Sequence, residues 1–245
     1  MLSIFKHKKP FLKDLTEGFT DIHSHVLFGI DDGAVTPEDS EFLLNSFVDL
    51  GFKNAITTPH TLKDVWNNTS QTIISKYNEV QGLLPELSSR LNLRVASEYL
   101  MDDSFVRLFE SEQLLTLKDN HVLVEMSYLN APIQLYDIIF ELQVAGYKPV
   151  LAHPERYLFY HRNFEEYKKL KLSGCALQLN LLSTVGYYGV NITKIADRLL
   201  SEGLIDFTGS DAHHLQHILS FEKELKIKNI DALKEVIKNN DFFAV

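Results

Sequence analysis

Seven short runs rich in apolar and β-branched residues recur along the chain, and most are followed by a longer stretch of helical pattern. Strands that alternate with helices are typical of a parallel sheet, because each helix carries the chain back to start the next strand. Most of the runs share a second property, since a histidine, an aspartate or a glutamate ends the run or follows it within three residues. They cover residues 19–23, 54–58, 94–98, 121–125, 149–152, 176–180 and 205–208.

The stretches between the runs carry signals for helix starts and ends. Thr36 is a good N-cap, Pro37 suits the first helical position, and the acids Glu38 and Asp39 suit the first turn. Apolar residues then recur at helical spacing up to Gly51, which ends the helix. We expect similar helices over residues 69–91, 132–145, 163–173, 190–202 and 229–239.

Two architectures are consistent with such a sheet, namely an open doubly wound sheet and a closed barrel. An open sheet gathers its site at one switch point between strands, whereas a barrel brings all strand ends around one mouth. Because polar candidates follow nearly every run, the barrel is favoured. Nothing in the sequence marks a linker or a repeat. We therefore expect one domain over residues 1–245, with residues 1–17 as an N-terminal extension.

The bulk composition narrows the classes of partner. The net charge of −9 argues against a nucleic-acid partner, which would require a basic patch. No stretch approaches the roughly 20 apolar residues of a membrane span. For the basic residues before Lys13 we favour a solvated tail over a contact with a membrane surface. The single cysteine, Cys175, cannot form an internal disulfide, which suits the reducing cytoplasm.

The positions of the histidines and acids predict a polynuclear metal centre. His23 and His25 lie two residues apart at a strand end, where a regular strand places both side chains on one side. Imidazole and carboxylate are the ligands that hold divalent metals such as Zn, Mn and Fe. Any one of these residues alone could be a surface or salt-bridged side chain, but their joint occurrence at separate strand ends favours metal binding. The candidate ligands are His23, His25, Asp32, His60, Glu98, Glu125, His153, Asp211 and His213.

The order of the motifs resembles that of the PHP (polymerase and histidinol phosphatase) superfamily. Between Asp21 and His213 the chain presents Asp-x-His-x-His, a lone histidine, two glutamates, His-Pro-Glu-Arg and Ser-Asp-x-His in succession. Within the superfamily, the sequence GIDDGA at 29–34 is similar to the bacterial manganese-dependent protein-tyrosine phosphatases linked to capsule and exopolysaccharide synthesis. The sequences SEY at 97–99 and LAHPERY at 151–157 resemble the same subgroup.

This resemblance implies a fold and a set of metal ligands. The expected fold is α/β, a distorted (β/α)7 TIM-like barrel known as the PHP fold. The expected cofactor is Mn²⁺, with three ions per chain and Fe or Zn as alternatives. Carried over, the ligands would be His23, His25, Glu98 and Asp211 for the first ion, Glu98, Glu125 and His153 for the second, and Asp32, His60 and His213 for the third.

Such a centre indicates a mechanism of phosphate ester hydrolysis. Two adjacent ions lower the pKa of a bridging water and generate a hydroxide, which we expect to attack phosphorus in line. Arg156 would hold the phosphate oxygens, because its guanidinium fork matches them, and Asp32 would act through the third ion. A tyrosyl leaving group, with a pKa of about 10, departs readily as a phenolate.

The substrate-binding residues are predicted from weaker signals. Members of the family often have an arginine soon after the last histidine, whereas this chain has none near His213. His214 and His217 are therefore candidates to assist in phosphate binding. Tyr187 and Tyr188 could form an aromatic wall against a phosphotyrosine ring, although packing within a loop also explains them.

The leading prediction is a cytoplasmic metal-dependent protein-tyrosine phosphatase whose partner is a tyrosine autokinase that governs polysaccharide export. A small-molecule phosphoesterase of the histidinol-phosphate type would use the same metals and is an alternative. A catalytically inactive regulatory binding module is another. A cysteine phosphatase is disfavoured because Cys175 leads into an apolar run rather than an anion-binding loop. The acidic charge disfavours a nuclease.

Overall fold

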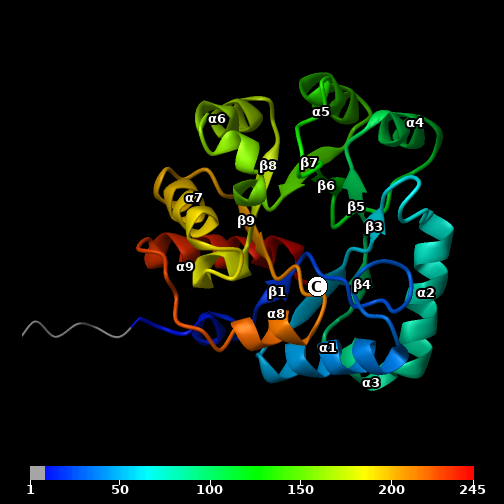
Figure 1. Ribbon diagram of the computed structural model, residues 1–245. Helices are drawn as coiled ribbons and strands as arrows, with labels where there is room; N and C mark the ends of the chain where they lie inside the picture. Colours follow the sequence, from blue (N-terminus) through cyan, green and yellow to red (C-terminus); the bar gives the residue numbers. More distant parts are fainter. Residues whose placement is uncertain (1–8) are drawn as a thin grey trace, which may run out of the picture.

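A closed wall of parallel strands forms the centre of the molecule, and helices surround it (Figure 1). The computed structural model describes residues 9–245. All strand pairs in its two sheets are parallel, in the orders β1-β2-β4 and β3-β5-β6-β7-β8-β9. The strands are β1 (Thr20–Asp21), β2 (Asn54–Thr57), β3 (His60–Thr61), β4 (Arg94–Val95), β5 (Glu98–Leu100), β6 (His121–Glu125), β7 (Lys148–Ala152), β8 (Ala176–Asn180) and β9 (Phe207–Gly209).

Two of the seven expected strands are each interrupted once. β2 pairs with β4, and β3 pairs with β5. Between these pairs the N–H of Ala96 donates to the Thr57 carbonyl (2.9 Å), and the N–H of Glu98 donates to the Pro59 carbonyl (3.1 Å). Pro59 has no N–H of its own, so the regular ladder cannot run through it. β2 and β3 therefore act as one interrupted strand, and β4 and β5 act as another. The prediction of an α/β barrel is confirmed.

The barrel closes along a seam between β1 and β9. The N–H of Asp211 donates to the His23 carbonyl (2.7 Å), and the N–H of His25 donates to the Ala212 carbonyl (2.9 Å). These bonds lie just beyond the ends of the two strands. The residues that complete the seam therefore include several of the predicted metal ligands.

The opposite end of the barrel is closed by a 3-10 turn near the C-terminus, Asn240–Phe243. The amide of Asn240 donates to the carbonyls of Thr20 (2.8 Å) and Thr208 (2.7 Å), which belong to β1 and β9. Phe243 is fully buried in a small apolar cluster with Ile22, which follows β1, and with side chains of β2, β6 and β7. The C-terminal turn thus plugs the barrel end that lies farthest from the site.

The helices differ from the sequence prediction in three places. The single helix expected over residues 69–91 is divided at Pro85, because proline lacks the N–H that a helix interior requires. Two short helices, α4 and α8, were not predicted. The helices are α1 (Pro37–Asp49), α2 (Ser70–Leu83), α3 (Pro85–Arg90), α4 (Asp103–Ser111), α5 (Leu135–Val144), α6 (Glu165–Leu172), α7 (Val190–Ser201), α8 (Leu215–Ser220) and α9 (Ile230–Asn239).

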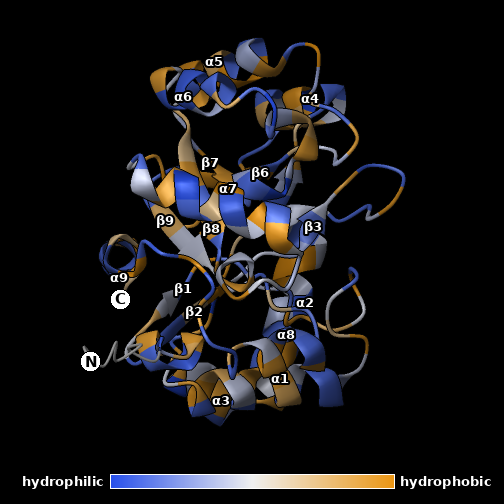
Figure 2. Ribbon diagram, turned by 60° about the vertical axis from the view of Figure 1, so that its left-hand side comes forward, coloured by the Kyte–Doolittle hydropathy of each residue, from blue (hydrophilic) through white to orange (hydrophobic). Residues whose placement is uncertain are grey.

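The main apolar core lies between the strands and the surrounding helices. In Figure 2 the helices α5 and α6 lie at one end of the molecule and α1 and α3 at the other, with the strands between them. Cys175 belongs to this core, as predicted, and burial raises the pKa of its thiol to about 12. A thiol in this state is not a nucleophile near neutral pH.

The expected N-terminal extension is described only in part. Residues 1–8 lie outside the described residues. Leu12 is fully buried, and its N–H donates to the Lys223 carbonyl (3.0 Å), so this part of the extension packs onto the barrel. Within residues 9–245, no helix has the length and hydrophobicity needed to cross a membrane.

Candidate metal centre and catalytic cavity

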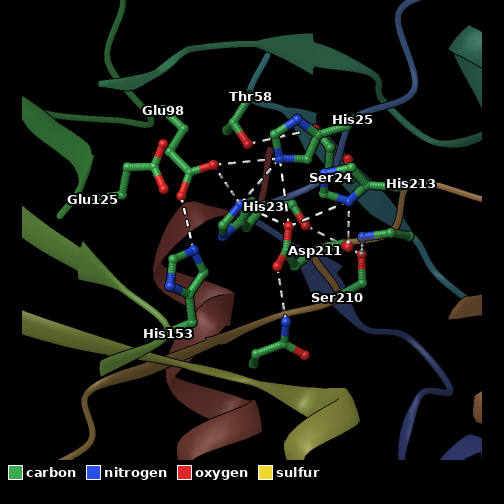
Figure 3. Close-up of polar contacts among 12 residues, drawn as sticks. His23, Ser24, His25, Thr58, Glu98, Glu125, His153, Ser210, Asp211 and His213 are labelled. Atoms are coloured by element: carbon green, nitrogen blue, oxygen red, sulfur yellow. Dashed lines mark hydrogen bonds and ion pairs between the residues drawn. The ribbon is translucent and has the colours of Figure 1, made fainter. Parts of the chain in front are cut away.

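The candidate ligands converge at the mouth of the barrel. Figure 3 shows them with the exception of Asp32 and His60, which it does not label. His23 and His25 follow β1, whereas Asp211 and His213 follow β9 across the closing seam. Each predicted ligand belongs to at least one close group of three or more ligand atoms. The other ligands come from β3, β5, β6, the residue after β7 and the loop before α1, and they are His60, Glu98, Glu125, His153 and Asp32.

The tightest group joins two histidines and two carboxylates. His23 Nε2 lies 3.2 Å from His25 Nε2, 3.1 Å from Glu98 Oε2 and 3.2 Å from Asp211 Oδ1. His25 Nε2 lies 3.4 Å from each of the same two carboxylates. Ligand atoms that bind one ion at about 2.1 Å are separated by about 3.0–3.4 Å in right-angle or tetrahedral geometry. The spacing of His23, His25 and Asp211 is that of ligands around one cation, and Glu98 groups with His23 and His153.

Hydrogen bonds on the far side of both rings fix their tautomers. His23 Nδ1 lies 2.8 Å from Gln178 Oε1, and His25 Nδ1 lies 2.8 Å from Asp31 Oδ2. An amide oxygen and a carboxylate only accept hydrogen bonds, so both rings donate through Nδ1. In the neutral rings the Nε2 lone pairs then point at carboxylate oxygens. That arrangement is repulsive unless a cation lies between them.

Glu98 lies among several histidines and connects the groups. Its Oε1 is 3.0 Å from His153 Nε2, and its Oε2 is 3.3 Å from His60 Nδ1, which lies 3.0 Å from Glu125 Oε1. The expected second ion joins Glu98, Glu125 and His153. Within the described chain the close groups instead join Glu98 with His153 and His23, and separately with His60 and Glu125.

A third group surrounds Asp32, whose side chain is 55% exposed at the mouth. The Oδ1 atom of Asp32 lies 3.5 Å from His60 Nε2 and 3.5 Å from His213 Nε2. His213 Nδ1 donates to the Asp211 carbonyl (2.8 Å), which leaves its Nε2 lone pair toward Asp32. The Nε2 atom of His60 therefore faces the group around Asp32, and its Nδ1 atom faces the group of Glu98 and Glu125.

The charges of the centre depend on one another. Burial alone would lower the pKa of His23, but the Glu98 and Asp211 carboxylates outweigh it and raise that pKa to about 10. The pKa of His60 rises to about 9 in the same way, chiefly through Glu98. Burial would raise the pKa of Glu98, but His23 and His60 hold it well below its usual range. Without cations, the centre is compatible with its buried carboxylates only when its histidines bind protons.

The donor set therefore fits divalent ions. His60 Nδ1 is buried and forms no hydrogen bond although it lies close to the carboxylates of Glu98 and Glu125, and His153 Nδ1 is buried without a hydrogen-bond partner among residues 9–245. Unpartnered buried nitrogens of this kind are costly and require a partner. A mixture of imidazole nitrogens and carboxylate oxygens suits Mn, Fe or Zn. The geometry supports metal binding in this region of the barrel.

A cavity of about 240 Å³ opens over the centre, and Arg156 lines it. Arg156 Nη1 donates to Asp211 Oδ2 (2.7 Å). Its guanidinium carbon lies 4.8 Å from the ring centre of Tyr128 and 4.2 Å from that of Tyr188. The two rings hold the plane of the guanidinium, and no other described residue accepts from it. Its remaining N–H groups are free for an anion in the cavity.

His214 and His217 also line the cavity, and so does Tyr188, one of the two predicted tyrosines. The N–H of His213 donates to His217 Nδ1 (3.1 Å), so the neutral His217 ring carries its proton on Nε2. Burial lowers the pKa of His217 to about 3. His214 caps α8 through its Nδ1 atom. Tyr188 borders the cavity, whereas Tyr187 is not among the lining residues and packs edge-on against His217.

Comparison with known proteins places the chain in a family. The family described as capsular polysaccharide synthesis, CpsB/CapC, matches residues 19–220. The chain belongs to this family. The resemblance seen in the sequence motifs is confirmed.

Relatives within the CpsB/CapC family carry phosphatase names. The tyrosine-protein phosphatase YwqE of Bacillus subtilis is 29% identical over 197 residues, which cover 80% of this chain and 78% of YwqE. The tyrosine-protein phosphatase CpsB of Streptococcus pneumoniae is 27% identical over 201 residues, which cover 80% of this chain and 83% of CpsB.

Solved structures share the fold. A crystal structure from work on YwqE of Bacillus subtilis and CpsB of Streptococcus pneumoniae, described as metal-dependent tyrosine phosphatases, matches with a TM-score of 0.80. The identity is 26%, and the match covers 91% of this chain and 93% of that one. The lactonase Lmo2620 of Listeria monocytogenes shares the fold alone, with a TM-score of 0.54 at 11% identity over 95% of both chains.

Sequence reasoning missed four residues around the CpsB/CapC site, namely Asp31, Tyr128, Gln178 and Asn180. Asn180 donates to Asp211 Oδ2 (2.9 Å), the oxygen that also accepts from Arg156. A polar residue in the middle of a buried strand run could have pointed to Gln178, and Asp31 adjoins a predicted ligand. No local signal distinguishes Tyr128 from other loop aromatics.

Proposed function

We propose that this chain is a metal-dependent protein-tyrosine phosphatase. The observation that carries the proposal is the convergence of imidazole lone pairs and carboxylates beside a cavity lined by a guanidinium. A metal centre next to a group that binds phosphate is the arrangement that phosphate ester hydrolysis requires. The phosphatase names of YwqE and CpsB support the same activity.

The proposed cofactor is Mn²⁺, with three ions per chain. When bound, the ions supply an activated water nucleophile and neutralise charge on the phosphate. The close groups of ligand atoms support most of the first set and the third set, whereas Glu125 groups with His60 and Glu98 rather than with His153. The proposed ligands are His23, His25, Glu98 and Asp211 for the first ion, Glu98, Glu125 and His153 for the second, and Asp32, His60 and His213 for the third.

Arg156 is proposed to orient the phosphate. One of its N–H groups is held by Asp211, which fixes the fork, and the others are free toward the cavity. His217 is a neutral donor on the cavity wall and is suited to a second phosphate oxygen. The His213 imidazole beside Asp32 holds the pKa of that carboxyl well below its usual range, so Asp32 stays ionised and serves as a ligand rather than as an acid.

The ester oxygen leaves without help from a strong acid. A tyrosyl oxygen departs as a phenolate, whose pKa of about 10 is far below that of an alkoxide. Tyr128 and Tyr188 border the cavity and limit the position of the substrate ring. We propose that the substrate is a phosphorylated tyrosine autokinase of the capsule or exopolysaccharide pathway. Because such a kinase uses ATP, we place the reaction in the cytoplasm.

The test compares substrates on metal-stripped protein titrated with Mn²⁺. Phosphotyrosyl peptide, phosphoseryl peptide and histidinol phosphate are offered in parallel, and phosphate release is measured. We expect metal-dependent release from the phosphotyrosyl peptide alone. Preference for histidinol phosphate would move the assignment to small-molecule metabolism, and absence of turnover with any divalent metal would leave a binding module.

A further inference from the structure

A groove beside the catalytic cavity collects three lysines without acidic partners. It has a volume of about 390 Å³, and its lining includes Lys194, Lys226 and Lys228. Gly186 and Val190, at the start of α7, form its near end. The segment between α8 and α9 forms the other wall and runs past α7 (Figure 1). The three lysines are exposed to solvent.

Three exposed lysines thus line one groove of a chain whose net charge is −9. Their ammonium groups form no ion pair or hydrogen bond with any residue between 9 and 245. The single acid in the lining, Asp197, is engaged, because its Oδ1 accepts from the backbone N–H groups of Lys228 and Asn229 at 2.8 and 2.9 Å. By contrast, ion pairs with acids are formed by Lys13, Lys76, Lys168, Lys169, Lys171, Lys234 and Lys238.

A second groove, lined by residues of α4 and its surroundings, also contains cations without ion pairs but differs in charge. That groove of about 410 Å³ is lined by Lys63 and Arg107, but Asp102 and Asp103 line it as well. Its charges therefore balance. The lysine groove carries three positive side chains against one aspartate, which is itself occupied by N–H donors. Its charge is complementary to a polyanion.

The groove and the catalytic cavity are lined by residues of the same short stretch of backbone. Tyr188 lines the cavity, and in the sequence it lies between Gly186 and Val190, which line the groove. Consecutive Cα atoms are 3.8 Å apart, so both groove residues lie within about 7.6 Å of the Tyr188 Cα. The N–H of Lys226 donates to the Thr184 carbonyl (2.8 Å), which holds the lysine segment against this turn.

We propose that the lysine groove binds acidic or phosphorylated residues of the same polypeptide whose phosphotyrosine occupies the cavity. This inference rests on the proposed function and specifies its substrate class. An extended peptide advances about 3.4 Å per residue. Negative charges roughly three to six residues from the phosphotyrosine therefore reach the lysines. Each exposed ion pair is weak, but together the three lysines favour substrates with several flanking negative charges.

The test uses the metal-loaded full chain and two matched triple variants. The groove variant carries Lys194→Gln, Lys226→Gln and Lys228→Gln. Two phosphotyrosyl peptides are compared, one with glutamates three to six residues on either side and one with glutamines there. The control variant removes the same charge near the N-terminal ends of the strands, through Lys53→Gln, Arg90→Gln and Lys148→Gln.

We expect the groove variant to raise the KM for the glutamate peptide about fivefold to tenfold, the effect of two or three exposed ion pairs. Its kcat, and its KM for the glutamine peptide, should match the wild type. High salt should abolish the preference of the wild type, because exposed charges are screened. A wild type without preference, or an equal loss in the control variant, would overturn the proposal.

Two further measurements distinguish a peptide-binding groove from a lipid-binding surface and from a chain without phosphatase activity. If the groove variant loses binding to vesicles of anionic phospholipid but keeps its preference for the glutamate peptide, the groove is a lipid surface and the proposal is wrong. If the wild type hydrolyses neither peptide, the proposed function fails. The groove is then tested by fluorescence anisotropy with non-hydrolysable phosphonate peptides, where the same loss of affinity in the groove variant supports it and equal affinities refute it.

Discussion

Single residues outside the ligand set determine the chemical state of the ligands. Gln178 accepts from the Nδ1 atom of His23, and Asp31 accepts from that of His25. Partners of this kind orient the ring and raise its basicity as a ligand. A change in one of them should therefore alter metal affinity although every ligand remains. Asp31 is the sharper case, because it is a buried carboxylate that also accepts from the N–H of Gly33 (3.0 Å).

The replacement Asp31→Asn should weaken metal binding. The amide fills the same space, but it carries no charge and offers one acceptor oxygen instead of two. We expect the affinity for Mn²⁺ to fall about 10–100-fold, measured by calorimetric titration of metal-stripped protein. The exposed Asp49→Asn variant is the control. Equal affinities in the two variants would show that Asp31 does not position His25.

The replacement Arg156→Lys should impair the reaction while keeping the positive charge. An ammonium cannot bond to Asp211 and grip a phosphate as a planar fork does, and it loses the stacking between Tyr128 and Tyr188. We expect kcat/KM for a phosphotyrosyl peptide to fall about 100-fold, and inorganic phosphate to inhibit more weakly. The exposed Arg162→Lys variant should behave as the wild type. Unchanged inhibition by phosphate in the Arg156 variant would place phosphate binding elsewhere.

At the scale of elements, the barrel depends on the seam between β1 and β9. Backbone bonds close it at the mouth, and Asn240 closes it at the opposite end. The Asn240 side chain also accepts from the N–H of Thr208 (3.0 Å), so one buried amide makes three hydrogen bonds to the two strands. Its removal leaves buried backbone groups without partners.

The replacement Asn240→Ala should therefore destabilise the protein. We expect a loss of about 3 kcal/mol in the free energy of unfolding, because buried groups left unpaired cost about 1–3 kcal/mol each. Urea denaturation measures this value. Asn239→Ala, which removes an exposed amide bonded to the Asp206 carbonyl, should cost less than about 1 kcal/mol. Similar losses in the two variants would show that Asn240 does not hold the seam.

The strands and the convergence of the candidate ligands were predictable from the sequence because their signals are local. A buried run that ends in a histidine or acid identifies both the strand and its ligand, as at Glu125 and His153. The partner of a ligand depends instead on which strands become neighbours, so the bond between Gln178 of β8 and His23 could not be foreseen. Helix α4 escaped prediction because it has nine residues and only two of them, Phe105 and Phe109, are buried.

At the scale of the whole molecule, the metal centre joins the two ends of the chain. His23 and His25 follow the first strand and Asp211 follows the last, so the first group of ligands spans the seam. Cations in this group attract both sides of the seam at once. In metal-free protein the same attraction depends on protons bound to the histidines. Removal of metal should therefore make the stability of the fold depend on pH in a defined direction.

Thermal unfolding of metal-free protein should show this dependence. The pKa of His23 is about 10 and that of His60 about 9, both raised from the ordinary 6.5. Groups whose pKa is raised by folding stabilise the fold fully below the unfolded pKa, and the contribution is lost as the pH rises through the folded pKa. With a chelator present, we expect Tm to fall between about pH 6.5 and pH 10.

Protein loaded with Mn²⁺ should lose less stability over this range, because the cations take the place of the protons. A His60→Gln variant should show a smaller decline in the chelator, since one of the titrating groups is gone. Parallel declines in chelator and in Mn²⁺ would mean that these histidines do not control the stability of the seam.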